Sequence, residues 1–155
     1  MEITIAFSGT RFGTPTMFPL VEYSIEHAIE LVVLRERQKI HPHHAEHRDF
    51  SSIGQTLAIQ IVHGASPVAT CLDWDSERVA RQRGYDVKRF AVEPSLDGKW
   101  PQAGHRRSVR MIVNAKPNIL LAMPLSGPRS KSRGTWHAIE AAVQERVFTL
   151  VVPVG

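Results

Sequence analysis

The sequence predicts an α/β protein with a Rossmann-like three-layer sandwich, in which helices cover both faces of a mostly parallel sheet of five or more strands. Short apolar runs alternate along the chain with stretches of helical periodicity, and several of these runs end at a glycine. The run Ile119 to Met123 is apolar throughout, as expected for a parallel strand buried on both faces. Right-handed crossovers between such strands place the helices on the sheet faces. No repeat or low-complexity linker divides the 155 residues, so we expect a single domain.

The first third of the chain predicts a strand and a long helix. Glu2 to Phe7 is a short β-type run that stops at Ser8-Gly9-Thr10-Arg11. Thr16 is a candidate N-cap, and Pro19 fits the first helical turn, where its missing N–H costs no hydrogen bond. Apolar residues at helical spacing then continue to about Arg37.

The middle of the chain predicts two strands around a helix. Leu57 to His63 reads as a strand and is followed by Gly64-Ala65-Ser66-Pro67. The next helix runs from about Asp75 to Arg83 and stops at Gly84, a residue typical of the C′ position. Val87 to Val92 is expected to form the third strand.

The last third predicts a covering loop and two more helix–strand pairs. Glu93 to Ala103, with its two prolines, is expected to be a loop. Arg106 to Val113 predicts a short helix before the apolar strand that ends at Met123. A basic, glycine-containing loop then leads into a helix from Trp136 to Val147, and Phe148 to Val152 forms the fifth strand.

Composition restricts the class of protein. The single cysteine, Cys71, excludes an internal disulfide. No apolar run reaches the roughly 18–20 residues of a membrane span, and the first residues lack a secretion signal, so we expect a cytoplasmic protein without a membrane partner. The net charge of +4 favours an anionic partner. Because the basic residues are scattered and are not interleaved with aromatic ones, nucleic acid is not the expected partner, and single-stranded nucleic-acid binding stays a third alternative.

Ligands of an open parallel sheet bind beyond the carboxyl ends of its strands, where four segments here combine small residues with a cation or a hydroxyl. The candidate ligand-binding residues are Ser8, Gly9, Thr10, Arg11, His63, Gly64, Ala65, Asp73, Gly104, Arg107, Ser108, Ser126, Gly127, Arg133, Gly134 and Thr135. The amides and hydroxyls expected to bind a phosphate belong to Gly9, Thr10, Gly127, Gly134 and Thr135. Arg107 and Arg133 would neutralise its charge.

Several side chains have two interpretations. Asp73 either accepts a hydrogen bond from a ribose hydroxyl or caps its helix. Trp136 either stacks on a base or packs in the core. No feature of the sequence marks a lowered pKa for Cys71, so we do not expect a nucleophile there. The histidines of His41 to His47, with Glu46, offer zinc or nickel ligands or form a solvated loop, and we expect no specific metal and no cofactor.

Four motifs follow one another in a fixed order. Ser8-Gly9-Thr10-Arg11 comes first, and His63-Gly64-Ala65 with Asp73, Ala80 and Gly84 comes second. Ala103 to Met111 is the third, similar to an Ala-Gly-x-x-Arg-Asn-x-x-Met block, and Ser126-Gly127 with Arg133-Gly134-Thr135 is the fourth. Together they resemble the SLOG superfamily, in particular its small YspA-like members, which are related to the LOG and DprA proteins. The resemblance spans the chain except for Gln38 to Ser52.

This resemblance implies a Rossmann-like fold that binds a nucleotide or nucleotide-derived ligand, such as a cyclic nucleotide or an ADP-ribose-type signal. LOG proteins hydrolyse the N-glycosidic bond of nucleoside monophosphates with a Glu at the position that Ala138 occupies here. We therefore expect a protein that senses or sequesters its ligand, as a phage counter-defence sponge would. The alternative is a nucleoside 5′-monophosphate phosphoribohydrolase that uses His137 or Glu140. The resemblance also implies a homo-oligomer, a dimer or larger, and an aromatic lid from Trp100.

Overall fold

A five-stranded, fully parallel sheet forms the middle layer of the protein, with the strand order β3-β2-β1-β4-β5. The computed structural model describes residues 1–40 and 56–155. Its strands are β1 (Glu2–Gly9), β2 (Ala58–His63), β3 (Asp86–Arg89), β4 (Ile119–Met123) and β5 (Phe148–Val151). The order reverses between β1 and β4, so the predicted Rossmann-like fold is confirmed.

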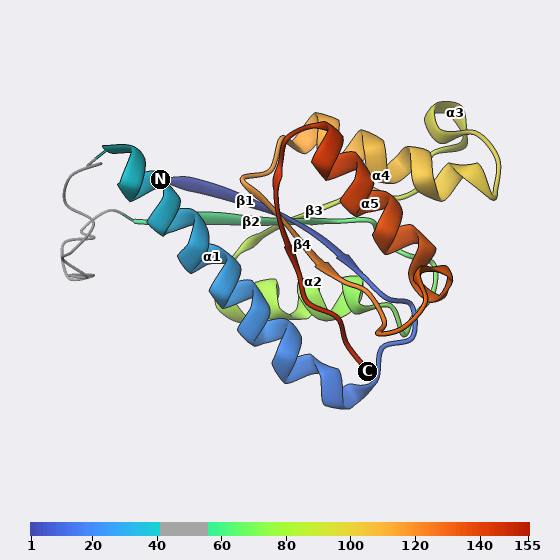
Figure 1. Cartoon of the computed structure of the whole chain (residues 1–155), viewed down its shortest axis with the longest axis horizontal. Helices are drawn as coiled ribbons and strands as arrows, with labels where there is room; N and C mark the ends of the chain where they lie inside the picture. The colour runs from blue at the N-terminus through green and yellow to red at the C-terminus, as the bar shows by residue number, and fades with distance from the viewer. Residues whose placement is uncertain (41–55) are drawn as a thin grey trace.

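Helices cover both faces of this sheet. On one face lie α1 (Phe18–Ile40) and α2 (Leu72–Arg83), and on the other lie α4 (Gln102–Ala115) and α5 (Arg133–Gln144) (Figure 1). Three short elements join them, namely the 3-10 turns η1 (Pro15–Met17) and η3 (Arg129–Ser132) and the helix α3 (Pro94–Asp97). The two long connections β1–β2 and β2–β3 therefore use one face, and the return from β3 to β4 uses the other.

Each face of the sheet has its own hydrophobic core, and the strand period of two decides which residue enters which core. In β1, Ile3, Ile5 and Phe7 pack with α1 and α2, whereas Ala6 packs with α4 and α5. All five residues of β4 are buried, as its continuous apolar run predicts. Since β1 and β4 are neighbours in the centre of the sheet, both cores hold the reversal point rigidly.

Several predicted boundaries were wrong, mostly at helix N-termini. Helix α4 begins at Gln102, four residues before the predicted start at Arg106. The prediction failed because Gly104 lies inside the first turn, where the low helix propensity of glycine argues against a helix. Helix α5 likewise includes Gly134 in its first turn and begins at Arg133. Thr16 is not an N-cap: it lies inside η1, and its hydroxyl pairs with that of Thr14 at 2.9 Å.

Other boundaries differ for local reasons. Helix α2 begins at Leu72, ahead of the predicted Asp75, and its end at Gly84 is confirmed, with the left-handed φ of 72° that glycine tolerates. β3 ends at Arg89, three residues before the predicted end. The predicted loop from Glu93 contains the short helix α3.

No helix in the described part of the chain is long and apolar enough to cross a lipid bilayer. The predictions for His41 to His47 lie outside the described residues.

Candidate functional site

A cleft of about 880 Å³ opens at the carboxyl edge of the sheet, beside the reversal point between β1 and β4. The segments that follow β1, β2 and β3 line it, together with η3 and the N-terminal turns of α4 and α5. In Figure 1 these two helices begin at the same edge at which the strands end. This position is where open α/β sheets bind their ligands.

Most of the predicted ligand-binding residues line this one cleft. They are Ser8, Gly9, Thr10, Arg11, Gly64, Ala65, Asp73, Gly104, Arg107, Arg133, Gly134 and Thr135. The structure therefore brings together the four segments that the sequence analysis selected, which are separated by up to about 130 residues in the chain.

Four predicted residues do not line the cleft. His63 is fully buried beneath it, and the hydroxyl of Ser108, also buried, donates to the carbonyl of Gly104 within α4 at 3.1 Å. Ser126 and Gly127 lie ahead of η3. The residues between the two parts of the fourth motif form this 3-10 turn, so that Ser130 to Thr135 line the cleft in place of Ser126 and Gly127.

The first loop does not offer the free amides that its glycine predicted. The amide of Gly9 donates to the Asp73 carboxylate at 3.1 Å, and that of Thr10 donates to the carbonyl of Met123 at 2.9 Å. Gly9 is a glycine for a packing reason, since a Cβ there would lie 2.5 Å from Cβ of Leu72. The prediction that the amides of Gly9 and Thr10 bind a phosphate is therefore wrong. These two amides instead form the hydrogen bonds that connect the end of β1 to α2 and to β4.

Arg107 lies across the glycine that follows β2. An added Cβ at Gly64 would fall 1.0 Å from Nη1 of Arg107, so the guanidinium occupies the space that any side chain at position 64 would need. Its Nε is buried without a hydrogen-bond partner among the described residues. Burial lowers the pKa of Arg107, and the nearby charge of Asp73 acts in the opposite direction. Arg107 is thus a partly desolvated cation held at the cleft wall.

Asp73 is the acidic residue that lines the cleft within the described chain, and it is not the N-cap of α2, because Cys71 occupies that position. Its Oδ1 accepts from the Gly9 amide. Burial, followed by the charge of Asp73, raises the pKa of the Cys71 thiol to about 12. Cys71 is therefore protonated at neutral pH and unsuited to nucleophilic chemistry, as the sequence analysis expected.

The N-terminal turns of α4 and α5 form a second wall, and both helices direct their positive ends to the cleft. The rings of His105 and His137, one from each helix, meet edge to face with centroids 4.4 Å apart. Burial, the neighbouring His105 and Arg133 all lower the pKa of His137, while Glu140 raises it. Gly134 has no atom within 4 Å of an added Cβ, so its backbone faces open space beside this pair.

Trp100 stands at the mouth of the cleft and is about half exposed. The Arg11 guanidinium lies 5.9 Å from its ring centroid, within cation–π range. Arg110 anchors the segment that precedes Trp100, because it donates to both oxygens of Asp97 at 2.9 and 2.8 Å. These hydrogen bonds lower the pKa of Asp97. Arg110 thus fixes the segment that precedes Trp100, and the Trp100 ring lies against Gly104 and within range of Arg11.

His63 has a structural role that the sequence did not indicate. Its Nδ1 accepts from the Ala65 amide at 3.1 Å, so Nε2 carries the proton and donates to Glu77 at 2.8 Å. Glu77 also accepts from Arg89 and Arg81, and the hydrogen bonds from these residues hold its pKa far below the usual range. This cluster fixes the turn after β2 on which Arg107 rests.

Two further basic residues of the cleft were not among the predicted site residues. His105 follows Gly104 directly, and Lys131 lies in the basic loop ahead of Arg133. The sequence signal for His105 was its place beside the predicted Gly104, and Lys131 lies two residues ahead of the predicted Arg133.

The candidates for catalysis are unequally placed. His137 lines the cleft, whereas Glu140 does not, and Ala138 is fully buried in the core beneath α5. Trp136 packs against that core, with Arg129 4.3 Å from its ring centroid, so its core-packing interpretation is the one realised. Within residues 1–40 and 56–155, no group of three His, Cys, Asp or Glu side chains is arranged to hold a metal ion.

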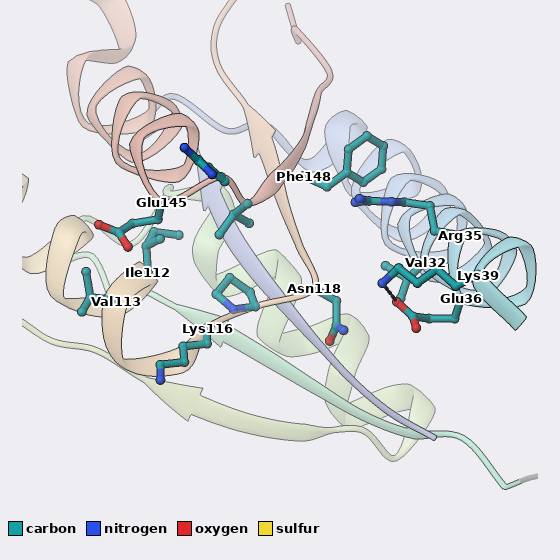
Figure 2. A pocket seen from close by; sticks show the side chains of 13 residues that line it. Val32, Arg35, Glu36, Lys39, Ile112, Val113, Lys116, Asn118, Glu145 and Phe148 are labelled. Atoms are coloured by element: carbon teal, nitrogen blue, oxygen red, sulfur yellow. Dashed lines mark hydrogen bonds and ion pairs between the residues drawn. The ribbon is translucent and has the colours of Figure 1, made fainter.

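A second cavity, of about 480 Å³, lies at the opposite edge of the sheet and is lined by none of the predicted site residues. Figure 2 shows α1 side chains on one side of it and Lys116 and Glu145 on the other. Lys39 pairs with Glu36 at 2.7 Å, and Arg35 stacks on Phe148 at 4.6 Å. The two cations that α1 contributes to this cavity are thus already partnered.

No protein-family model matches the chain, and no curated protein matches it. A solved structure described as a UDP-N-acetylglucosamine 2-epimerase from Listeria monocytogenes is similar over 97% of this chain, at 12% identity and a TM-score of 0.44. The chain spans 29% of the length of that protein. The similarity is a distant one of fold.

Proposed function

We propose that the protein binds a nucleotide or nucleotide-derived ligand through its phosphate groups in the carboxyl-edge cleft. One observation carries this proposal: Arg11, Arg107, Lys131 and Arg133 all line the cleft, and none makes an ion pair within the described chain. Arg81, Arg83, Arg89 and Arg110, by contrast, are each paired with a carboxylate. Arg107 is the partly desolvated member of this group, and unpaired cations that line one cleft favour an anion as the missing partner.

The remaining cleft chemistry suits a nucleotide rather than a bare anion. Trp100 offers an aromatic face at the mouth on which a base can stack. Asp73, with one oxygen bonded to Gly9, can accept from a ribose hydroxyl through the other. The cleft lining thus offers a group for each part of a nucleotide: an aromatic ring for the base, a carboxylate for the ribose and cations for the phosphate.

We propose that the ligand is held and not hydrolysed. Glycoside hydrolysis calls for a carboxylate placed at the anomeric centre. The position where LOG enzymes carry it is Ala138, which is buried in the core, and Glu140 does not line the cleft. The competing hypothesis is a phosphoribohydrolase that uses His137, whose lowered pKa leaves it neutral and able to accept a proton at pH 7.

Three finer proposals rest on the order of the four sequence motifs. We propose that the protein belongs to the SLOG superfamily, that it sequesters a signal nucleotide as a phage counter-defence sponge, and that it assembles into a homo-oligomer. Light scattering coupled to size-exclusion chromatography tests the last: a mass of one chain at micromolar concentration would refute it.

The test of binding is incubation with a panel of nucleotides, with mass spectrometry of the bound and free fractions. Sequestration predicts an intact nucleotide released on denaturation, whereas free base plus ribose phosphate would favour the hydrolase. Arg107→Ala is expected to lower phosphate-dependent affinity about 10- to 100-fold with the fold retained. The matched control is Arg106→Ala, an exposed neighbour on α4 that does not line the cleft. Unchanged affinity in Arg107→Ala would show that the binding site lies elsewhere.

A further inference from the structure

The cleft cations fall into two groups. Arg107 lies on Gly64 at the end of β2, and the charges that act on it are those of Asp73, Cys71, Arg11 and Asp97. The second group lies at the start of α5, where the charges that act on His137 are those of His105, Glu140 and Arg133. The Arg107 guanidinium lies on Gly64, whereas the rings of His105 and His137 lie against each other at the start of α5, so the cleft contains two positive regions.

Helix geometry explains the separation. His105 and Arg107 are two residues apart on α4, so their side chains leave the helix in directions that differ by about 200°. Arg107 is therefore directed to the β2 end, where it contacts Gly64, and His105 is directed to α5, where it meets the His137 ring. Helix α4 thus divides the cleft wall and supplies one member to each positive region.

In neither region does a cleft cation form an ion pair with a carboxylate of the described residues. In the first, Asp73 is already bonded to Gly9, and Arg107 Nε is buried without a hydrogen-bond partner. In the second, Nδ1 of His105 is buried without a partner, and Arg133 and Lys131 form no ion pair. A single phosphate can complete one region, and the volume of about 880 Å³, near the upper end for ligand pockets, leaves room for a second.

We propose that the cleft binds a nucleotide that carries two phosphate groups at separate positions, one held by Arg107 and Arg11 and the other by Arg133 and the His105–His137 pair. The proposal rests on the proposed function and specifies its ligand class. It differs from binding of a nucleoside monophosphate, which fills one region and leaves the other uncompensated.

Three adenine nucleotides separate these possibilities by isothermal titration calorimetry. AMP has one phosphate, ADP has two at the same end, and adenosine 3′,5′-bisphosphate has two on opposite sides of the ribose. The bisphosphate is expected to bind at least about 20-fold more tightly than AMP, since the second phosphate gains charge-assisted hydrogen bonds. ADP is expected to lie within about fivefold of AMP.

Variants locate the two phosphates. Arg107→Ala and Arg133→Ala should each lower affinity for the bisphosphate about 10-fold or more, whereas AMP affinity should respond to one of them and not to the other. Arg106→Ala is the control for both, and circular dichroism checks that each variant is folded. If AMP binds and the bisphosphate binds no more tightly, the two-phosphate inference is overturned while the proposed function stands. If none of the three nucleotides binds below millimolar concentration, both fail.

Discussion

A single contact, the Arg107 guanidinium over Gly64, decides how the candidate site is built. The guanidinium is a partly desolvated positive group of the cleft wall, and its position depends on the missing side chain at residue 64. Arg107 has no hydrogen bond of its own in the described structure that would otherwise hold it there. Gly64 at this strand end therefore leaves space for the Arg107 side chain, and its role is not to let a phosphate approach the backbone.

Gly64→Ala should consequently abolish the site without unfolding the protein. The new Cβ would displace the end of a flexible side chain, which is cheap, and Gly64 is not among the glycines with positive φ. We expect affinity for adenosine 3′,5′-bisphosphate, measured by calorimetry, to fall as far as in Arg107→Ala, with the midpoint of thermal unfolding changed by less than about 3 °C. Wild-type affinity in Gly64→Ala would mean that the observed position of Arg107 does not matter for binding.

At the scale of the element, α2 joins the site to the sheet through Glu77. This carboxylate is buried and accepts from His63 of β2, Arg89 of β3 and Arg81 of its own helix. The three donors come from three elements, so one side chain fixes the end of β2, the end of β3 and α2 relative to one another. The turn that carries Gly64 begins at the residue to which Glu77 is bonded.

Glu77→Gln is expected to destabilise the protein by about 2 kcal/mol, because it removes the charge that two arginines share while one of the partners, His63, is fully buried. The pKa of Glu77 is lowered in the folded state, so its contribution is present above the unfolded value of 4.5 and is lost as the pH falls below it. Urea unfolding at pH 7 and pH 3.5 tests both points. The difference between wild type and variant should shrink at pH 3.5, and a difference that grows on acidification would contradict the assignment.

At the scale of the whole molecule, the cleft joins parts of the fold that otherwise meet mainly through the sheet. Its walls come from the β1 and β2 ends on one side and from the α4 and α5 N-termini on the other. A ligand held between them contacts both halves and binds the folded state alone. Binding should therefore appear as added stability.

Adenosine 3′,5′-bisphosphate at about 100 times its dissociation constant should stabilise the fold by about 2.7 kcal/mol, or raise the unfolding midpoint by about 5–10 °C. Differential scanning fluorimetry measures this shift. Arg107→Ala at the same ligand concentration should show less than half of the shift, and Arg106→Ala should show all of it. An equal shift in all three proteins would point to binding outside the cleft.

The sequence by itself determined the layers of this protein and the edge that carries the site. Hydrophobic periodicity is a local property, so the five strands, the helices between them and the buried strand Ile119 to Met123 were predictable. The parallel alternation brings all strand ends to one edge, so residues as distant as Thr10 and Arg133 were correctly placed in one region. Helix starts were not predictable, because Gly104 and Gly134 lie where propensity disfavours helix.

The tertiary structure alone decided which polar atoms are free. The amides of Gly9 and Thr10 looked available in the sequence but bond to Asp73 and Met123, residues 64 and 113 positions away. His63 looked like a ligand-binding residue but is used by Glu77. Hydrogen-bond partners of this kind are distant in sequence, and no local pattern encodes them. The sequence therefore predicted the edge at which the candidate site lies, and the long-range contacts decided that Arg107, Arg133 and their neighbours line it without an ion pair in the described chain.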